Sequence, residues 1–268
     1  MLLREVSYAR ASSVEQAVQL LSAHDDARAL AGGQTLINVM KARAAAPDVL
    51  VDLTDLQELR GIELGSDGTV VIGAMTTYSD LIGSAEARAR PILGEVCEQI
   101  ADVQVRNRGT IGGNVCSNDP TNHLPPLLVA VGATMTIVGQ DGARTVPAEE
   151  FFLGVYMTAA GPGELLTKIS VPAGKTDGFA SVSIGKDGTC IVNVAASLEN
   201  GAPRLAIGCV DAVPVVVLPG SAEEDAVRGA VRDAALDPPS DVHATADFRR
   251  HLAEVLALRA VAEAARRG

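Results

Sequence analysis

The first third of the chain alternates between helical and strand-like patterns of apolar residues. Within residues 13–22 the apolar side chains recur at helical spacing. Residues 28–31 form a short apolar run that ends at the Gly32-Gly33 pair, which predicts a strand entering a tight turn. A second helical pattern begins at Thr35, and residues 49–53 predict a buried strand.

Further along, the pattern changes to hairpins. Pairs of short apolar runs flank the Gly-rich tetrapeptides 65–68 and 139–142, which predict turns between antiparallel strands. Between the two hairpins we expect helices over about 92–100 and 124–131. Two consecutive prolines near the start of the second helix are tolerable only in its first turn.

The last third predicts a separate unit. Three strand patterns, over 178–184, 189–198 and 204–210, indicate an antiparallel three-stranded sheet, and two amphipathic helices follow. The first of these helices is expected to begin at the capping box Ser221-Ala222-Glu223-Glu224. With a boundary near Pro172, the chain reads as an α+β protein with domains over 1–172 and 173–268.

Composition limits the possible functions. Of 268 residues, 47% are apolar and 21% are charged, which is typical of a globular protein. The formal net charge of -11 argues against a broad nucleic-acid-binding surface, which needs clustered basic residues. No apolar run approaches the ~18 residues of a membrane span, and the start has no signal-peptide core. We therefore expect a cytoplasmic protein.

The cysteines and histidines do not have metal-ligand spacing. The four cysteines (Cys97, Cys116, Cys190 and Cys209) include no Cys-x-x-Cys pair, and the four histidines form no H-E-x-x-H motif. This spacing fits neither a structural zinc site nor a ferredoxin-type iron–sulfur cluster. We expect reduced, mostly buried thiols and no metal bound by this chain.

The candidate chemistry lies in two glycine-rich segments, Ala31-Gly32-Gly33-Gln34-Thr35 and Thr110-Ile111-Gly112-Gly113-Asn114. Glycines let consecutive backbone N–H groups approach phosphate oxygens, because no Cβ blocks the approach. Such pairs are more often plain turns, and the G-x-G-x-x-G and G-x-x-x-x-G-K-[ST] motifs are missing. The residues alone indicate a two-domain α+β protein with two possible anion-binding turns.

A resemblance extends in order over nearly the whole chain. Its parts are the first glycine segment, the stretches 47–53 and 72–77, Gln104 to Asn114 with R-N-x-G-T-I-G-G-N, Asp119-Pro120, 151–156 with 163–166, and 247–260. Read together, they resemble the FAD-binding subunits of molybdenum hydroxylases, such as the medium subunits of carbon monoxide and nicotine dehydrogenases and the xanthine dehydrogenase flavin domain.

The resemblance implies an FAD-binding domain of the vanillyl-alcohol-oxidase/PCMH type, with subdomains of about 1–55 and 56–172. The two glycine segments would wrap the FAD diphosphate and ribityl chain, with Leu166 and Ile100 near the flavin or adenine. His123 stands where many relatives have an acidic residue, and Lys186 is the one basic residue in a commonly basic stretch. The implied cofactor contacts are Ala29, Leu30, Ala31, Gly32, Gly33, Gln34, Thr35, Leu36, Ile100, Thr110, Ile111, Gly112, Gly113, Asn114, His123, Leu166 and Lys186.

The function implied by the resemblance is an electron relay without a catalytic acid or base in this chain. Electrons from a molybdopterin large subunit would cross 2Fe-2S clusters in a small subunit, reach FAD here and pass to NAD, oxygen or a quinone. The expected assembly is a dimer of heterotrimers. Two alternatives stay open: a self-sufficient FAD-dependent oxidoreductase, and a non-catalytic nucleotide-binding scaffold.

Overall fold

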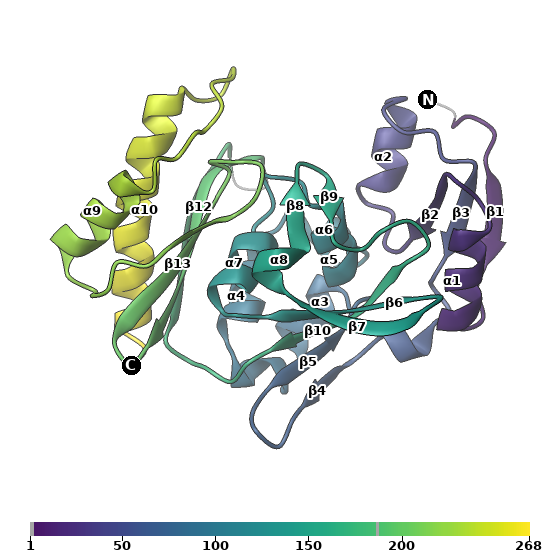
Figure 1. Ribbon diagram of the computed structural model, residues 1–268, viewed down its shortest axis with the longest axis horizontal. Coiled ribbons are helices and arrows are strands. Elements are labelled where there is room, and N and C mark those ends of the chain that lie inside the picture. The colour runs from purple at the N-terminus through teal and green to yellow at the C-terminus, as the bar shows by residue number, and fades with distance from the viewer. Residues whose placement is uncertain (1–2, 186–187) are drawn as a thin grey trace.

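The computed structural model describes residues 3–185 and 188–268. Over these residues the chain forms three sheets and one short hairpin, arranged along the long axis of the molecule (Figure 1). Apolar residues from the sheets and their helices make three core clusters, built mainly from alanine, valine, leucine and isoleucine. Each sheet therefore has its own core, as expected where helices and sheets bury one face against each other.

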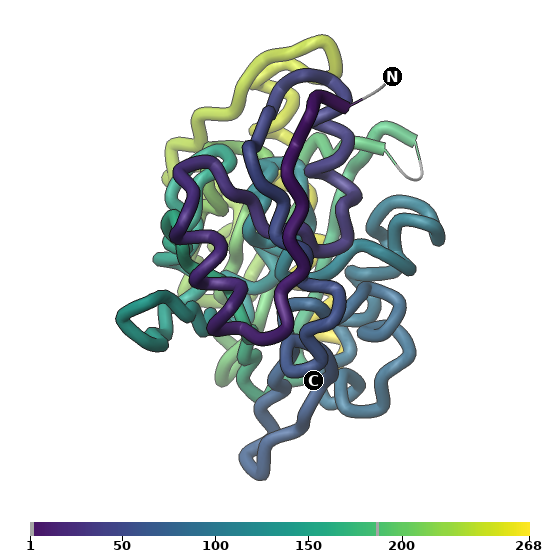
Figure 2. The backbone as a smooth tube through the Cα atoms, turned by 90° about the vertical axis from the view of Figure 1, so that its right-hand side faces the viewer, coloured from purple at the N-terminus to yellow at the C-terminus, as the bar shows by residue number. Residues whose placement is uncertain are grey.

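The N-terminal unit is a parallel three-stranded sheet backed by a helix. The strands lie in the order β1-β3-β2, and both pairs are parallel. Helix α1 buries its apolar side chains against this sheet, as its helical spacing predicts. Figure 2 shows the unit facing the viewer. Its elements are β1 (Ser7–Arg10), α1 (Val14–Ser22), β2 (Ala27–Leu30), α2 (Leu36–Lys41) and β3 (Val49–Asp52).

The central part is an antiparallel five-stranded sheet in the order β4-β5-β10-β6-β7. The two predicted hairpins form its two edges, and β10 lies between them. Its strands are β4 (Ile62–Leu64), β5 (Val70–Gly73), β6 (Thr134–Gly139), β7 (Gly142–Pro147) and β10 (Leu165–Val171).

Short helices cover this sheet and share its core. The prolines of α7 are its second and third residues, within the first turn, where a backbone N–H would have no partner inside the helix. The helices are α3 (Tyr78–Gly83), α4 (Ile92–Glu98), α5 (Val103–Arg106), α6 (Ile111–Ser117), α7 (Leu124–Ala130) and α8 (Ala148–Phe151), with 3-10 turns at Gln57–Leu59 and Ala87–Ala89. The small hairpin is β8 (Phe152–Gly154) with β9 (Met157–Thr158).

The C-terminal part has an antiparallel sheet of four strands, so the prediction of three strands was wrong. The fourth strand, β14 (Val215–Val217), follows Pro214 and is too short to show an alternating pattern, yet it pairs with β13. The other elements are β11 (Asp177–Ser183), β12 (Cys190–Glu199), β13 (Ala202–Gly208), α9 (Glu224–Asp233) and α10 (Ala246–Ala265).

The expected capping box at the start of α9 was also wrong. The helix begins at Glu224, and the N-cap residue Glu223 makes no side-chain capping bond. The Ser221 hydroxyl instead accepts a hydrogen bond from the Glu223 N–H at 3.4 Å, which closes a local turn before the helix. Serine side chains often accept hydrogen bonds from nearby backbone N–H groups in this way.

Strand β12 connects the two large parts of the chain because its two faces pack on different partners. Val192, Val194 and Ala196 belong to the core shared with α10. Ala195 belongs to the core of the central part, and Asn193 donates a hydrogen bond to the Asn122 carbonyl just before α7. The C-terminal sheet is therefore buried on both sides, between α10 and α7 (Figure 1).

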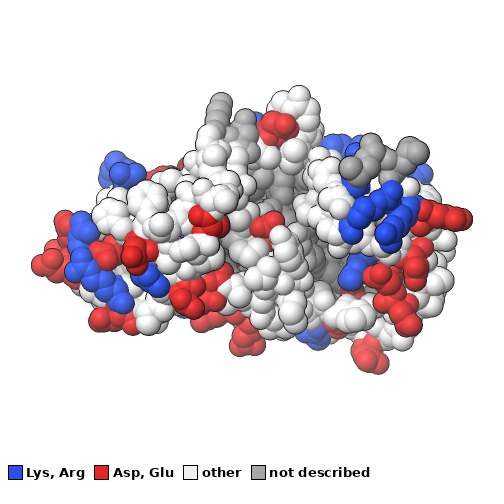
Figure 3. All heavy atoms as spheres, turned by 90° about the horizontal axis from the view of Figure 1, so that it is seen from above, with Lys and Arg blue, Asp and Glu red and all other residues white. Residues whose placement is uncertain are grey.

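Charged side chains of both signs mix on the surface. Seen from above, basic groups gather mainly toward the two ends of the molecule, while the charged groups visible across the middle are mostly acidic (Figure 3). No helix within residues 3–185 and 188–268 combines the length and hydropathy needed to cross a membrane.

Candidate functional site

The two glycine-rich segments lie side by side in the structure. The first joins β2 to α2, and the second begins α6. A Cβ on Gly32 would lie 2.1 Å from the Arg108 carbonyl oxygen, just before the second segment. A Cβ on Gly113 would lie 3.7 Å from the Ala31 Cβ. Residues about 80 positions apart thus meet backbone to backbone, and only glycine fits at the closest point.

The first segment turns sharply at the end of β2. Gly33 has a φ of +71°, a left-handed conformation that favours glycine. The Gln34 amide donates to the Gly32 carbonyl at 3.0 Å, which braces the turn. Thr35 is the N-cap residue of α2, but its side chain makes no capping bond. Ala29 and Leu30 are the last residues of β2, and Leu36 is the first residue of α2. The predicted cofactor contacts from Ala29 to Leu36 therefore all lie on or next to the turn that joins β2 to α2.

The second segment is held against the loop after β5. The Thr110 hydroxyl accepts a hydrogen bond from the Gly113 N–H at 3.1 Å and caps α6. The N–H groups of Ile111 and Gly112 donate to the carbonyls of Thr76 and Ala74 at 3.0 and 2.9 Å. The stretch 72–77 therefore positions α6, a role that the sequence pattern did not assign to it.

Asn114 carries an unsatisfied acceptor at this site. Within the described part of the chain, its buried side-chain oxygen Oδ1 has no hydrogen-bond partner. The same side chain does form a hydrogen bond with the Tyr78 hydroxyl. Burial raises the pKa of Tyr78 well above its usual range, although the hydrogen bond with Asn114 acts in the opposite direction. Buried polar atoms are nearly always paired, and leaving one unpaired costs free energy. A bound molecule that donates a hydrogen bond to Asn114 would remove this cost.

Ile100 and Leu166 lie in the packing of the central part. Leu166 is buried in the core cluster, and Ile100 is half-buried against it. The pairing of β10 with β6 shifts between Leu166 and Lys168, and the Thr167 carbonyl there accepts from the Ala74 N–H at 2.9 Å. This irregular stretch therefore joins Leu166 to the loop that holds α6. Lys186, the remaining basic candidate, lies outside the described residues.

His123 faces the C-terminal sheet. The residue is buried at the N-cap of α7, and its Nδ1 lies 3.4 Å from the Asn193 side-chain nitrogen on β12. Its ring lies 5.3 Å from that of Phe179 on β11, at 49°. The sequence pattern identified neither Asn193 nor Phe179, because no local signal reports which strand lies opposite α7.

The described residues contain no group of three or more His, Cys, Asp or Glu side chains that could hold a metal ion. The chemistry that this site offers is therefore recognition by backbone and amide groups. It has a close glycine-lined approach between two segments and one free, buried amide oxygen.

Comparison with known proteins agrees with this geometry. Residues 4–174 match the family model described as the FAD binding domain in molybdopterin dehydrogenase. The chain is 40% identical to the carbon monoxide dehydrogenase medium chain of Afipia carboxidovorans, over 96% of both chains. It is 33% identical to the glyceraldehyde dehydrogenase medium chain of Sulfolobus acidocaldarius, over 97% of this chain and 99% of that one.

A solved structure extends the likeness to the whole fold. The reconstituted CO dehydrogenase from Oligotropha carboxidovorans contains a chain that superposes with a TM-score of 0.92, at 36% identity and 100% coverage of both chains. With a family model matched over more than half of its residues and relatives matched over nearly all of them, this chain belongs to the family of FAD-binding domains of molybdopterin dehydrogenases.

Proposed function

We propose that this chain is the FAD-carrying subunit of a molybdenum hydroxylase complex and relays electrons without binding the primary substrate. The observation that carries the proposal is the meeting of the two glycine segments beside the free Asn114 oxygen. Family membership indicates FAD as the molecule held there. Bound FAD would supply a redox centre that accepts electrons singly and releases them in pairs.

The residues of this chain would hold and position the cofactor. Gly32 and Gly33 would let backbone N–H groups approach the diphosphate closely, and Gly113, whose own N–H donates to Thr110, would leave room for it because it has no Cβ. Asn114 Oδ1 would accept a hydrogen bond from a hydroxyl or amide of FAD. Leu166 and Ile100 would cover apolar ring surface, and His123 and Lys186 would complete the polar contacts. No residue of this chain would act as a general acid or base.

The fold proposed for this function is the two-subdomain type of the vanillyl-alcohol-oxidase/PCMH flavoproteins. Its support is the separation of the parallel N-terminal sheet from the five-stranded sheet, with one glycine segment contributed by each part. We propose the first domain boundary near residue 172, beyond which the chain enters β11.

The proposed partners are a molybdopterin-containing large subunit and a small subunit with 2Fe-2S clusters, assembled as a dimer of heterotrimers. The two relatives named above support the medium-subunit role, since both are called medium chains. They also differ in the substrate that gives each its name, which fits a substrate site outside this subunit. The acceptor is proposed as NAD, oxygen or a quinone. The free thiols of all four cysteines suit the reducing cytoplasm.

The test has two stages. The purified chain should be yellow and should release FAD on acid precipitation, because no covalent attachment is expected. It should be reducible by dithionite yet show no turnover of carbon monoxide, aldehydes or N-heterocycles. Co-expression with the genes for its large and small partners should then give a stable complex with hydroxylase activity. A colourless chain would favour the scaffold, and turnover by the lone chain would favour the self-sufficient oxidoreductase.

A further inference from the structure

Two buried thiols meet at one side chain on the C-terminal sheet. Cys190 is the first residue of β12, and Cys209 directly follows β13. Their exposed fractions are 2% and 5%. The side-chain nitrogen Nδ2 of Asn193 lies 3.5 Å from the Cys190 sulfur and 3.6 Å from the Cys209 sulfur. The two cysteines are 19 positions apart in the sequence, yet both sulfurs lie next to the same amide nitrogen.

Two local irregularities produce this meeting. The pairing of β11 with β12 shifts between Val182 and Ser183, which leaves Ile191 as an extra residue in β12. Such a bulge turns Cys190 onto the face opposite to the one that the strand alternation would give it. Cys209 has a φ of +66°, a conformation that a non-glycine side chain rarely adopts. Without these two features the sulfurs would not both reach the face that packs against α7.

The surroundings divide the two thiols into a nucleophile and a proton-bearing partner. The hydrogen bond with Cys209 and then the nearby His123 lower the pKa of Cys190 to about 5, although burial opposes the shift. The same hydrogen bond and burial raise the pKa of Cys209. By contrast, burial raises the pKa of Cys97 and of Cys116 to about 12, which keeps both as unreactive thiols.

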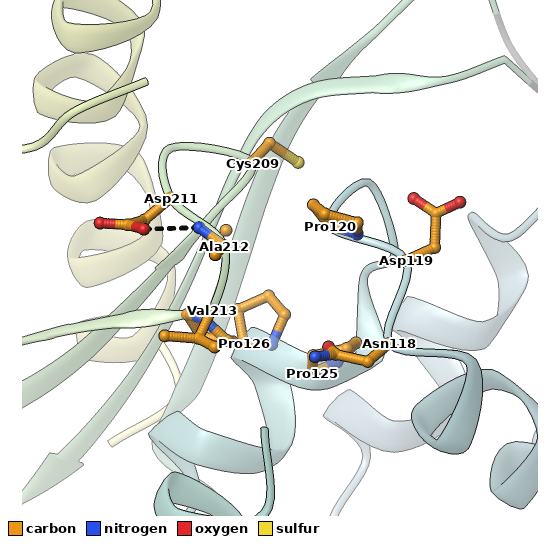
Figure 4. Close-up of a pocket in the computed structure, with 11 residues that line it drawn as sticks. Asn118, Asp119, Pro120, Pro125, Pro126, Cys209, Asp211, Ala212 and Val213 are labelled. Atoms are coloured by element: carbon orange, nitrogen blue, oxygen red, sulfur yellow. Dashed lines mark hydrogen bonds between the residues drawn. The ribbon is translucent and has the colours of Figure 1, made fainter. Parts of the chain in front are cut away.

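A small surface hollow reaches the Cys209 side of the pair. Cys209 lines it together with Asp119, Pro120 and Asp211. In Figure 4 the Cys209 sulfur points across the hollow toward the loop that carries Pro120. A small reagent can approach Cys209 from this hollow, whereas a protein disulfide or glutathione is too large to reach sulfurs that are almost fully buried.

We propose that Cys190 and Cys209 are a redox-active dithiol that hydrogen peroxide closes to an intramolecular disulfide. The Cys190 thiolate attacks one peroxide oxygen, the O–O bond breaks, and the departing hydroxide takes up a proton as water. The Cys209 sulfur then attacks the Cys190 sulfenic acid. The S–S bond forms, the S–O bond breaks, and the thiol proton of Cys209 leaves with the hydroxide as a second water. Peroxide is reduced, and the two thiols are oxidised.

Closing the disulfide would change the contact between the two large parts of the chain. Asn193 and His123 would lose the thiolate that both face, at the point where β12 meets the start of α7. The proposal concerns this junction and does not depend on FAD being the bound cofactor.

The experiment uses the full chain. Reduced protein is treated with hydrogen peroxide, quenched with catalase, alkylated in denaturant and analysed by intact mass and peptide mapping. We expect the number of free thiols to fall from four to two, with one cross-linked peptide joining Cys190 to Cys209. Dithiothreitol should restore all four thiols. Four thiols after peroxide, a disulfide between two chains, or a sulfinic acid on one sulfur without a cross-link would each overturn the proposal.

Substitutions give the matched comparison. Cys190→Ser and Cys209→Ser should each abolish the cross-link, whereas Cys116→Ser should leave it unchanged because Cys116, in α6, takes no part in the proposed disulfide. A cross-link that persists in Cys209→Ser would contradict the assignment. If a serine variant fails to fold, peptide mapping of the unsubstituted chain still decides between the two outcomes.

Discussion

Arg90 and Asp177 form a buried, two-pronged ion pair between the central part and the C-terminal sheet. The Arg90 Nε and Nη2 groups each donate to one Asp177 oxygen at 2.8 Å. The two side chains are only 4% and 1% exposed. Arg90 also donates to the Ser197 hydroxyl at 3.0 Å and to the Pro172 carbonyl at 2.6 Å. The guanidinium therefore joins the connecting segment to two strands of the following sheet.

Replacing Asp177 should destabilise the protein strongly. Asp177→Asn keeps the volume but leaves the buried Arg90 charge without its partner, and breaking a buried pair in this way costs about 3–5 kcal/mol. The measurement is the free energy of unfolding from urea titration. The control is Glu224→Gln, which removes the exposed pair with Arg228 and should cost less than about 0.5 kcal/mol. Equal losses in the two variants would show that burial does not set the strength of the Arg90 pair.

Adding one methyl group at Gly32 should weaken FAD binding. The Cβ would lie 2.1 Å from the Arg108 carbonyl oxygen, so the two glycine segments must move apart. Overpacking of this kind costs about 1–3 kcal/mol, which corresponds to a Kd for FAD raised by a factor of about 5 to 150. Fluorescence titration of the apoprotein measures the Kd, and circular dichroism monitors the fold. Gly229→Ala is the control, because its Cβ meets no atom within 4 Å in the middle of α9.

The free oxygen of Asn114 gives a separate prediction. Asn114→Ala removes the acceptor and should raise the Kd for FAD about tenfold, the usual effect of one lost hydrogen bond of about 1.5 kcal/mol. Tyr78→Phe removes only the hydroxyl that hydrogen-bonds the Asn114 side chain and keeps its oxygen. This second variant should bind FAD nearly as tightly as the unsubstituted chain. An Asn114→Ala chain with unchanged affinity would mean that the cofactor does not use this oxygen.

Asp52 should make the N-terminal unit sensitive to acid. Burial alone would raise the pKa of Asp52, but hydrogen bonds from Thr54 and Tyr8 and the charge of Arg10 outweigh burial and lower it. A lowered folded-state pKa contributes stability above the unfolded value of about 3.9, and this stability is lost as the pH falls through the folded value.

Asp52→Asn should therefore lower the free energy of unfolding at pH 7 by about 1.5–3 kcal/mol, the range for hydrogen bonds to charged groups. The difference from the unsubstituted chain should shrink as the pH falls below about 4 and through the lowered folded-state pKa of Asp52. Asp55→Asn is the control, since it removes a more exposed partner of Arg10 and should change stability at pH 7 by less than about 0.5 kcal/mol. A difference that does not vary with pH would rule out ionisation of Asp52 as its cause.

Local signals account for the parts of the fold that could be predicted from the sequence. Apolar spacing predicted α1, the glycine-rich turns predicted both hairpins, and the two prolines indicated the first turn of α7. Each of these signals depends only on residues close together in the sequence. The first glycine segment was recognisable as a turn for the same reason, but the turn expected at the second was wrong, because Gly112 to Asn114 lie inside α6. Nothing local indicated that Gly32 would meet the backbone at Arg108, since that contact depends on how two separate sheets pack.

The features that could not be predicted involve distant partners or local irregularities. Strand β10 inserts between two hairpins, and its position follows from pairing rather than from its own pattern. No local pattern indicates that Arg90 is buried, because its partner Asp177 lies 87 positions further along the chain. The meeting of Cys190 with Cys209 required a bulge and a left-handed residue, neither of which the sequence marks with glycine.

The two-faced packing of β12 also bears on how this chain can change in evolution. Substitutions at Val192, Val194 or Ala196 can be compensated by changes in α10 alone. Those at Asn193 or Ala195 must suit α7 and its surroundings. Adjacent residues of this one strand are therefore constrained by different packing partners. A recombination event that exchanged everything after residue 174 would replace both sets at once, and the positions of β12 that face the central part, such as Asn193 and Ala195, would have to fit the resident half.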